Sequence, residues 1–86
     1  MEWQEVRAQF PQQWVLIEAV SAHDEGDKRI VEQVAVLGVF ADSAAAMKHY
    51  AQLHREQPQR EMFVFHTSRQ ELDITIRYWL GLRRAS

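Results

Sequence analysis

The chain has 86 residues, of which 47% are hydrophobic and 26% are charged, and its formal net charge is −2. This length leaves no room for a second core, so we expect a single domain over residues 1–86. The charge balance lacks the basic excess typical of nucleic-acid-binding proteins. The absence of cysteine excludes disulfides, thiolate zinc sites and a cysteine nucleophile.

The N-terminal sequence MEWQEVRAQF lacks the order of basic and then apolar residues that a secretion signal has. The longest apolar run, residues 34–41, is far shorter than the roughly 20 residues that a membrane helix needs. We therefore expect a cytoplasmic protein with no membrane partner. The lack of cysteine fits a reducing compartment of this kind.

The first predicted element is a short amphipathic helix. Trp3, Val6 and Phe10 fall at helical spacing, and polar residues lie between them. Pro11 follows, and a proline disfavours helical geometry at the residue before it. The helix is therefore expected to end there and to dock through one apolar stripe.

Two long strands are predicted next, over residues 13–22 and 30–40, because both segments are rich in β-branched and aromatic residues. The polar segment 23–29 lies between them and contains a glycine. We expect an antiparallel hairpin with a loop longer than the tight two-residue type.

A second helix is predicted after the hairpin, with Asp42 or Ser43 as its N-cap and Pro58 just beyond its end. The buried stripe of this second helix is expected to comprise Ala46, Met47, Tyr50 and Leu53. A third strand is expected after it, over residues 61–66.

The C-terminal region is ambiguous between strand and helix. Residues 72–82 alternate with period two, which favours a fourth strand, but several of their apolar residues also fit helical spacing. Just before them, Ser68 and Glu71 match the S-x-x-E capping box, which predicts one helical turn.

The element order predicts an α+β fold, α-β-β-α-β-β, with a four-stranded, mainly antiparallel sheet. Numbering the strands along the chain, we expect the order 2-1-3-4, with both helices on one face. The other face would be open to a partner. Tyr78 and Trp79 are the predicted interface residues, because tyrosine and tryptophan are enriched at binding hot spots.

A candidate anion or ligand site lies at the end of the third strand, where the sequence HTSR comprises His66, Thr67, Ser68 and Arg69. A strand end that leads into a helical turn offers free N–H groups, and these side chains add hydroxyls and positive charge. The alternative is purely structural: Ser68 caps a turn, and Glu71 fills the anion position.

Metal and cofactor sites are not expected. The chain has four histidines, but His49 and His54 are five residues apart and cannot converge on one ion from a helix. There is no G-x-S-x-G elbow, phosphate loop or dinucleotide fingerprint. These patterns favour a protein that is not an enzyme.

The segments QWVLIEA, PQREMFVFHTSR and WLGLR together resemble a group of short, uncharacterised α+β proteins of Gram-positive and related bacteria. In that group a tryptophan-led strand precedes a hairpin, a helix and an aromatic strand. The resemblance covers most of the chain and implies a bacterial cytoplasmic protein. It implies no activity and assigns no functional residue.

The resulting hypothesis is a non-enzymatic protein-interaction or regulatory module, which forms a homodimer or binds an unidentified protein. The second hypothesis is a protein that binds a small anion or ligand through HTSR.

Overall fold

The computed structural model describes residues 1–75 of the chain. Their elements follow the predicted order α-β-β-α-β-β. The predicted interface residues Tyr78 and Trp79 lie outside the described residues. The helices and strands are α1 (Trp3–Gln9), β1 (Trp14–Glu25), β2 (Lys28–Phe40), α2 (Ser43–Glu56), β3 (Met62–His66) and β4 (Ile74–Thr75).

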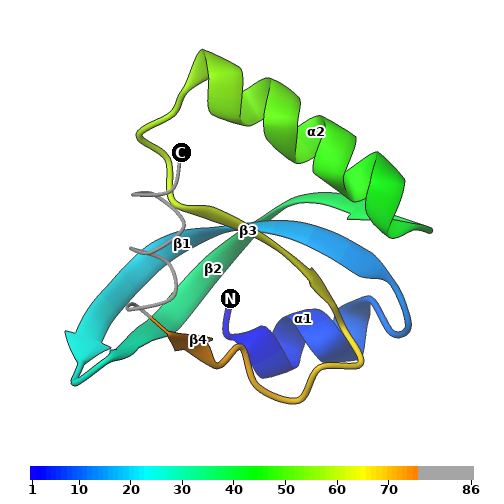
Figure 1. The fold of residues 1–86 in the computed structure, drawn as a ribbon. Coiled ribbons are helices and arrows are strands. Elements are labelled where there is room, and N and C mark those ends of the chain that lie inside the picture. Colours follow the sequence, from blue (N-terminus) through cyan, green and yellow to red (C-terminus); the bar gives the residue numbers. More distant parts are fainter. Residues whose placement is uncertain (76–86) are drawn as a thin grey trace.

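The sheet has four strands, and all of its pairings are antiparallel, which confirms the α+β prediction (Figure 1). Its order is β3-β1-β2-β4, so the predicted neighbours of the first three strands are correct. The predicted place of the fourth strand, beside the third, is wrong. β4 pairs instead with Lys28 and Arg29 at the start of β2.

The segment between β3 and β4 explains this position. After β3 the chain crosses to α1, where the Trp3 indole N–H donates to the Arg69 carbonyl oxygen at 2.9 Å. The Gln4 amide donates to the carbonyl oxygen of Gln70 at 2.7 Å. These bonds direct the chain beneath the sheet toward the hairpin tip, where β4 forms (Figure 1).

The β1–β2 hairpin is longer than predicted, and its loop is shorter. Glu25 pairs with Lys28, so only Gly26 and Asp27 form the turn, and the expected longer loop is wrong. Gly26 has φ +60°, a conformation that glycine adopts at little cost. The polar residues near the tip stay extended because several of them form cross-strand ion pairs, described below.

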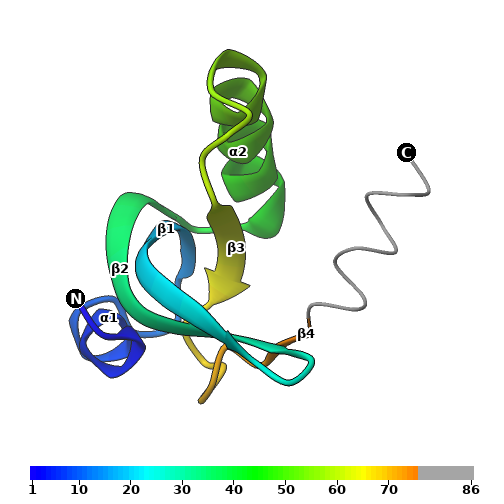
Figure 2. The same cartoon turned by 90° about the vertical axis from the view of Figure 1, so that its left-hand side faces the viewer.

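The two helices lie on opposite faces of the sheet, so their predicted placement on one face is wrong (Figures 1 and 2). Trp3 and Val6 of α1 form one buried cluster with residues that include Val15 and Ile17. The side chain of Leu16 lies on the other face, because side chains alternate along a strand. Leu16 is also fully buried, so β1 has an apolar side chain to cover on each face.

Neither helix within residues 1–75 is long and apolar enough to cross a membrane.

Candidate functional site

Thr67, the second residue of HTSR, is 3% exposed and forms only internal bonds. Its hydroxyl donates to the carbonyl oxygen of Phe10 at 2.7 Å and accepts from the backbone N–H of Gln13 at 3.1 Å. Its own backbone carbonyl accepts from Arg7 Nε at 2.9 Å. The residue therefore joins the end of β3 to α1 and to the α1–β1 loop.

His66 lies on the face of the sheet that α2 covers. Its ring is edge-on to the indole of Trp14, with centroids 5.1 Å apart. Its Nδ1 lies 2.7 Å from the hydroxyl oxygen of Ser68, and the Ser68 backbone N–H donates to the same nitrogen at 3.2 Å. Ser68 thus contacts the imidazole of His66, and no helix is present at residues 68–71.

Arg69 lies toward the opposite face. Its guanidinium stacks over the Phe65 ring at 4.8 Å, and its Nε donates to the backbone carbonyl of Glu71 at 3.0 Å. Phe65 and His66 are adjacent in β3 and therefore point to opposite faces. The structure therefore does not bring the side chains of His66 and Arg69 together around one position.

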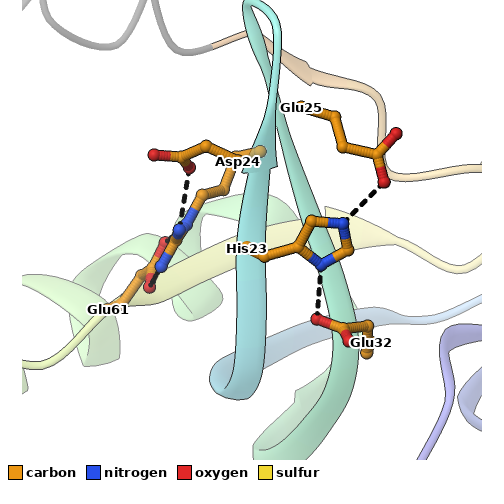
Figure 3. Close-up of polar contacts among 6 residues, drawn as sticks. His23, Asp24, Glu25, Glu32 and Glu61 are labelled. Atoms are coloured by element: carbon orange, nitrogen blue, oxygen red, sulfur yellow. Dashed lines mark hydrogen bonds and ion pairs between the residues drawn. The ribbon is translucent and has the colours of Figure 1, made fainter.

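A polar cluster that sequence reasoning treated only as a charged turn lies near the hairpin tip (Figure 3). His23 Nε2 contacts Glu25 at 2.6 Å, and His23 Nδ1 contacts Glu32 at 2.9 Å. Hydrogen bonds to Glu25 and then to Glu32 raise the pKa of the His23 imidazole. The cluster joins β1 to β2 most strongly when the imidazole is protonated.

A second ion-pair group lies on the other side of the hairpin, where Figure 3 shows Asp24 and Glu61. Arg29 donates to Asp24 at 2.8 Å and, through Nε and Nη2, to both carboxylate oxygens of Glu61 at 2.9 Å each. The hydrogen bonds to Glu61 and then to Asp24 raise the pKa of Arg29. This group connects the hairpin to the residue that precedes β3.

Two further ion pairs join separate segments. Arg60 Nε donates to Glu18 at 2.9 Å, and the hydrogen bond from Arg60 lowers the pKa of the Glu18 carboxyl group. Lys28 donates to Asp73 at 2.7 Å, and this bond lowers the pKa of the Asp73 carboxyl group. Each pair connects the hairpin to a segment that follows α2, so these charges stabilise the arrangement of strands.

Within residues 1–75, no three or more histidine, aspartate or glutamate side chains are grouped so that they could hold a metal ion. His49 and His54 each lie against an aromatic ring: the His49 ring is tilted by 46° to the Phe40 ring at 5.6 Å, and the His54 ring stacks on Tyr50 at 5.5 Å. The two histidines therefore have separate aromatic neighbours, Phe40 for His49 and Tyr50 for His54.

These ring pairs belong to a surface that we call the α2 face. Trp14 pairs in register with Phe40 on one side and with His66 on the other, so the three side chains form a row across the sheet. The helix α2 packs over this side. The α2 face comprises Trp14, Phe40, Met47, His49, Tyr50, His54 and His66.

The α2 face is only partly covered. Ala46 is the only fully buried residue of α2, and Met47 is 50% exposed. Trp14, Phe40 and Tyr50 are half-buried. Sequence reasoning placed Met47 and Tyr50 in the buried stripe of this helix, because helical spacing identifies the side of a helix but not how completely a neighbour covers it.

Packing beneath the α2 face depends on a glycine. A Cβ added at Gly38 would lie 2.7 Å from the Phe40 ring, which is far inside van der Waals contact. The ring lies over Gly38 and reaches His49 of α2 from there. This glycine therefore leaves room for the Phe40 ring between the sheet and His49 of α2.

Comparisons of the chain with protein-family models, with curated proteins and with solved structures give no significant match. The resemblance to short bacterial α+β proteins therefore stays a prediction. Two surfaces remain as candidates for function: the HTSR segment, in which Thr67 is buried, and the α2 face, which is only partly covered.

Proposed function

We propose that the chain is a non-enzymatic protein-interaction module that self-associates, and that the α2 face is its contact surface. The observation that carries this proposal is the incomplete cover of that face. Met47 is 50% exposed, the rings of Trp14, Phe40 and Tyr50 are half-buried, and α2 fully buries a single residue. Exposed apolar surface of this kind is typical of a binding region.

The residue types on the α2 face suit protein contact. Tryptophan and tyrosine are enriched among the residues that contribute most to binding energy. Methionine adapts its shape to a partner because its side chain is unbranched and flexible. The rings of Trp14, Phe40 and Tyr50 are also held in place by histidine neighbours, so little side-chain freedom remains to be lost on binding.

Charge favours a second copy of the chain as the partner. The seven residues that define the α2 face include no aspartate, glutamate, lysine or arginine, and Glu18, on the same side of β1, is paired with Arg60 at 2.9 Å. In a symmetric dimer the same patch contributes from both subunits, so a charge near the two-fold axis would face its own copy. A patch without these four residue types avoids that cost.

The polar groups elsewhere support a binding role over catalysis. The side chains of Thr67, Arg29 and Glu18 all form bonds that join one segment to another.

We place the protein in the cytoplasm, because a chain without cysteine is suited to a reducing compartment.

The alternative, anion binding at HTSR, has less support. Thr67 is buried, and the side chains of His66 and Arg69 lie toward opposite faces. A thermal-shift titration with inorganic phosphate tests it directly. A saturable rise in Tm that is lost in His66→Gln would restore this alternative.

Sedimentation velocity of a Met47 variant tests the proposed contact surface. Met47→Glu introduces a charge at the most exposed apolar side chain of the α2 face, on the surface proposed for contact, where a partner would have to desolvate it. We expect it to weaken self-association at least about tenfold, a loss of about 1.4 kcal/mol.

The matched control is Gln52→Glu, which adds the same charge to an exposed position of α2 outside the α2 face. It is expected to leave association nearly unchanged. Equal effects of the two variants, or none from Met47→Glu, would contradict the assignment of this surface.

A further inference from the structure

We infer that a second copy of the chain pairs with β3, antiparallel to it, along the edge that no strand within residues 1–75 covers, so that two four-stranded sheets join into one. This inference rests on the proposed function and names the backbone contact by which self-association occurs. Three observations carry it: the direction of the backbone groups of β3, the contrast between the two edges of the sheet, and the sequence of β3.

The backbone groups of Val64 point away from β1. The Ala19 N–H donates to the Glu61 carbonyl at 2.9 Å, and the Thr67 N–H donates to the Gln13 carbonyl at 2.9 Å. In an antiparallel pair, such bonded positions alternate with positions whose N–H and C=O groups point outward. Residues 61, 63, 65 and 67 therefore face β1, and residues 62, 64 and 66 face outward.

The two edges of the sheet differ. Along β2, the Val34 N–H donates to the Met1 carbonyl at 2.7 Å, and the Met1 nitrogen donates to the Val34 carbonyl at 3.0 Å. β4 covers the same edge at Lys28 and Arg29. Among residues 1–75, no strand lies beside the outer edge of β3.

The sequence of β3 does not protect this edge. Proteins usually prevent pairing at an exposed strand with lysine, proline, inward-pointing charges or bulges. The strand MFVFH contains no lysine, proline or carboxylate, and its pairing with β1 is regular over all five residues. Such a strand favours addition of another strand.

The strand is also complementary to itself about Val64. Antiparallel pairing centred there places Val64 opposite Val64 of the second copy and Met62 opposite His66. The two Val64 residues exchange N–H and C=O bonds, and each His66 N–H donates to a Met62 carbonyl. Phe63 lies opposite Phe65 of the second copy, which makes two aromatic cross-strand pairs.

This pairing connects the edge to the α2 face. A two-fold axis perpendicular to the joined sheet keeps equivalent faces of both copies on the same side. Because α2 packs against β3 as well as β1 and β2, both α2 faces would lie on one side of the joined sheet (Figure 2). In this assembly the two α2 faces lie side by side on that surface and do not oppose each other.

Cysteine crosslinking tests the inference in a chain that has no cysteine of its own. Bonded antiparallel partners have Cα atoms about 5.5 Å apart, within the range that a disulfide spans. Val64→Cys is expected to form a covalent dimer under mild oxidation. The control is Val20→Cys in β1, where the native side chain is 66% exposed, and it is expected to crosslink at least about tenfold more slowly at equal concentration.

A proline variant gives a second readout. Val64→Pro removes an N–H that points away from β1, and an edge strand tolerates proline at such a position. We expect self-association to weaken about tenfold or more, because two symmetric bonds are lost. Val64→Thr keeps the N–H and is expected to associate within about threefold of the wild type.

The outcomes separate the two proposals. A wild-type chain that is monomeric at all concentrations overturns the proposed function and this inference together. A wild-type dimer with no selective crosslinking of Val64→Cys and no weakening by Val64→Pro overturns this inference alone. Selective crosslinking together with weakening supports pairing at β3.

Discussion

At the scale of single residues, Thr67 shows how a residue from a candidate site stabilises the fold. Its hydroxyl satisfies the Phe10 carbonyl and the Gln13 N–H, and its backbone carbonyl accepts from Arg7. One residue therefore fixes the positions of α1, the α1–β1 loop and the end of β3. Removal of the hydroxyl leaves two backbone groups without their partner.

Thr67→Val keeps the shape of the side chain and removes the hydroxyl. We expect the free energy of unfolding to fall by about 1–3 kcal/mol, the cost of leaving a buried polar group unsatisfied. Urea denaturation measures it. Ser68→Ala, at the exposed neighbouring position, is expected to change stability by less than about 0.5 kcal/mol. A Thr67→Val protein as stable as the wild type would show that these bonds contribute little.

The residues of HTSR were identifiable from the sequence, but their roles were not. Hydroxyl and cationic residues at a strand end are compatible with an anion site or with internal bonding. The partners of Thr67 are 57 and 54 residues distant along the chain, so local spacing could not reveal them. Alternation along β3 does predict that Phe65 and His66 point to opposite faces.

At the scale of elements, the hairpin tip depends on charge. His23 lies between two carboxylates, which raise the pKa of its imidazole. A raised pKa means that the folded hairpin binds the proton more tightly than the unfolded chain does. The contribution of this group to stability is therefore fully present below the ordinary histidine pKa of about 6.5 and is lost as pH rises through the folded value.

An NMR titration of the His23 imidazole checks this sign. We expect its midpoint to lie above about 6.5 in the wild type. The double variant Glu25→Gln/Glu32→Gln removes both carboxylates and is expected to return the midpoint to that value or below it. Asp27→Asn, which removes another charge of the tip, is the control and should leave most of the rise in place. A wild-type midpoint at or below 6.5 would contradict the geometry of this cluster.

The sequence was informative about elements and less so about their boundaries and neighbours. Period-two alternation and helical spacing located the first five elements, because these patterns follow from local burial. The sixth was left open between strand and helix over residues 72–82, and of this range the structure describes a strand at Ile74–Thr75. The turn at Gly26 and Asp27 was predicted too long, since the ion pairs of His23 and Arg29 keep polar residues in the strands. The position of β4 depends on bonds from α1 to the segment after β3, which no local pattern encodes.

At the scale of the whole molecule, the distribution of apolar residues decides the proposed assembly. Both faces of β1 carry buried apolar residues, so a helix covers each face of the sheet. The prediction that both helices lie on one face would have left the apolar residues of the other face exposed to water. The helix α1 buries Trp3 and Val6 completely or nearly so, whereas α2 fully buries only Ala46. The less complete cover on the α2 side, next to the β3 edge that no strand within residues 1–75 covers, is the basis for proposing a dimer.

The mass of the full-length chain in solution tests this central claim most directly. Multi-angle light scattering over a range of concentrations is expected to show a rise from the monomer mass of 10.1 kDa toward twice that value as concentration increases. The same measurement on Val64→Pro is expected to need a higher concentration to reach the dimer. A mass that stays at 10.1 kDa up to millimolar concentration would contradict self-association through β3 and the α2 face.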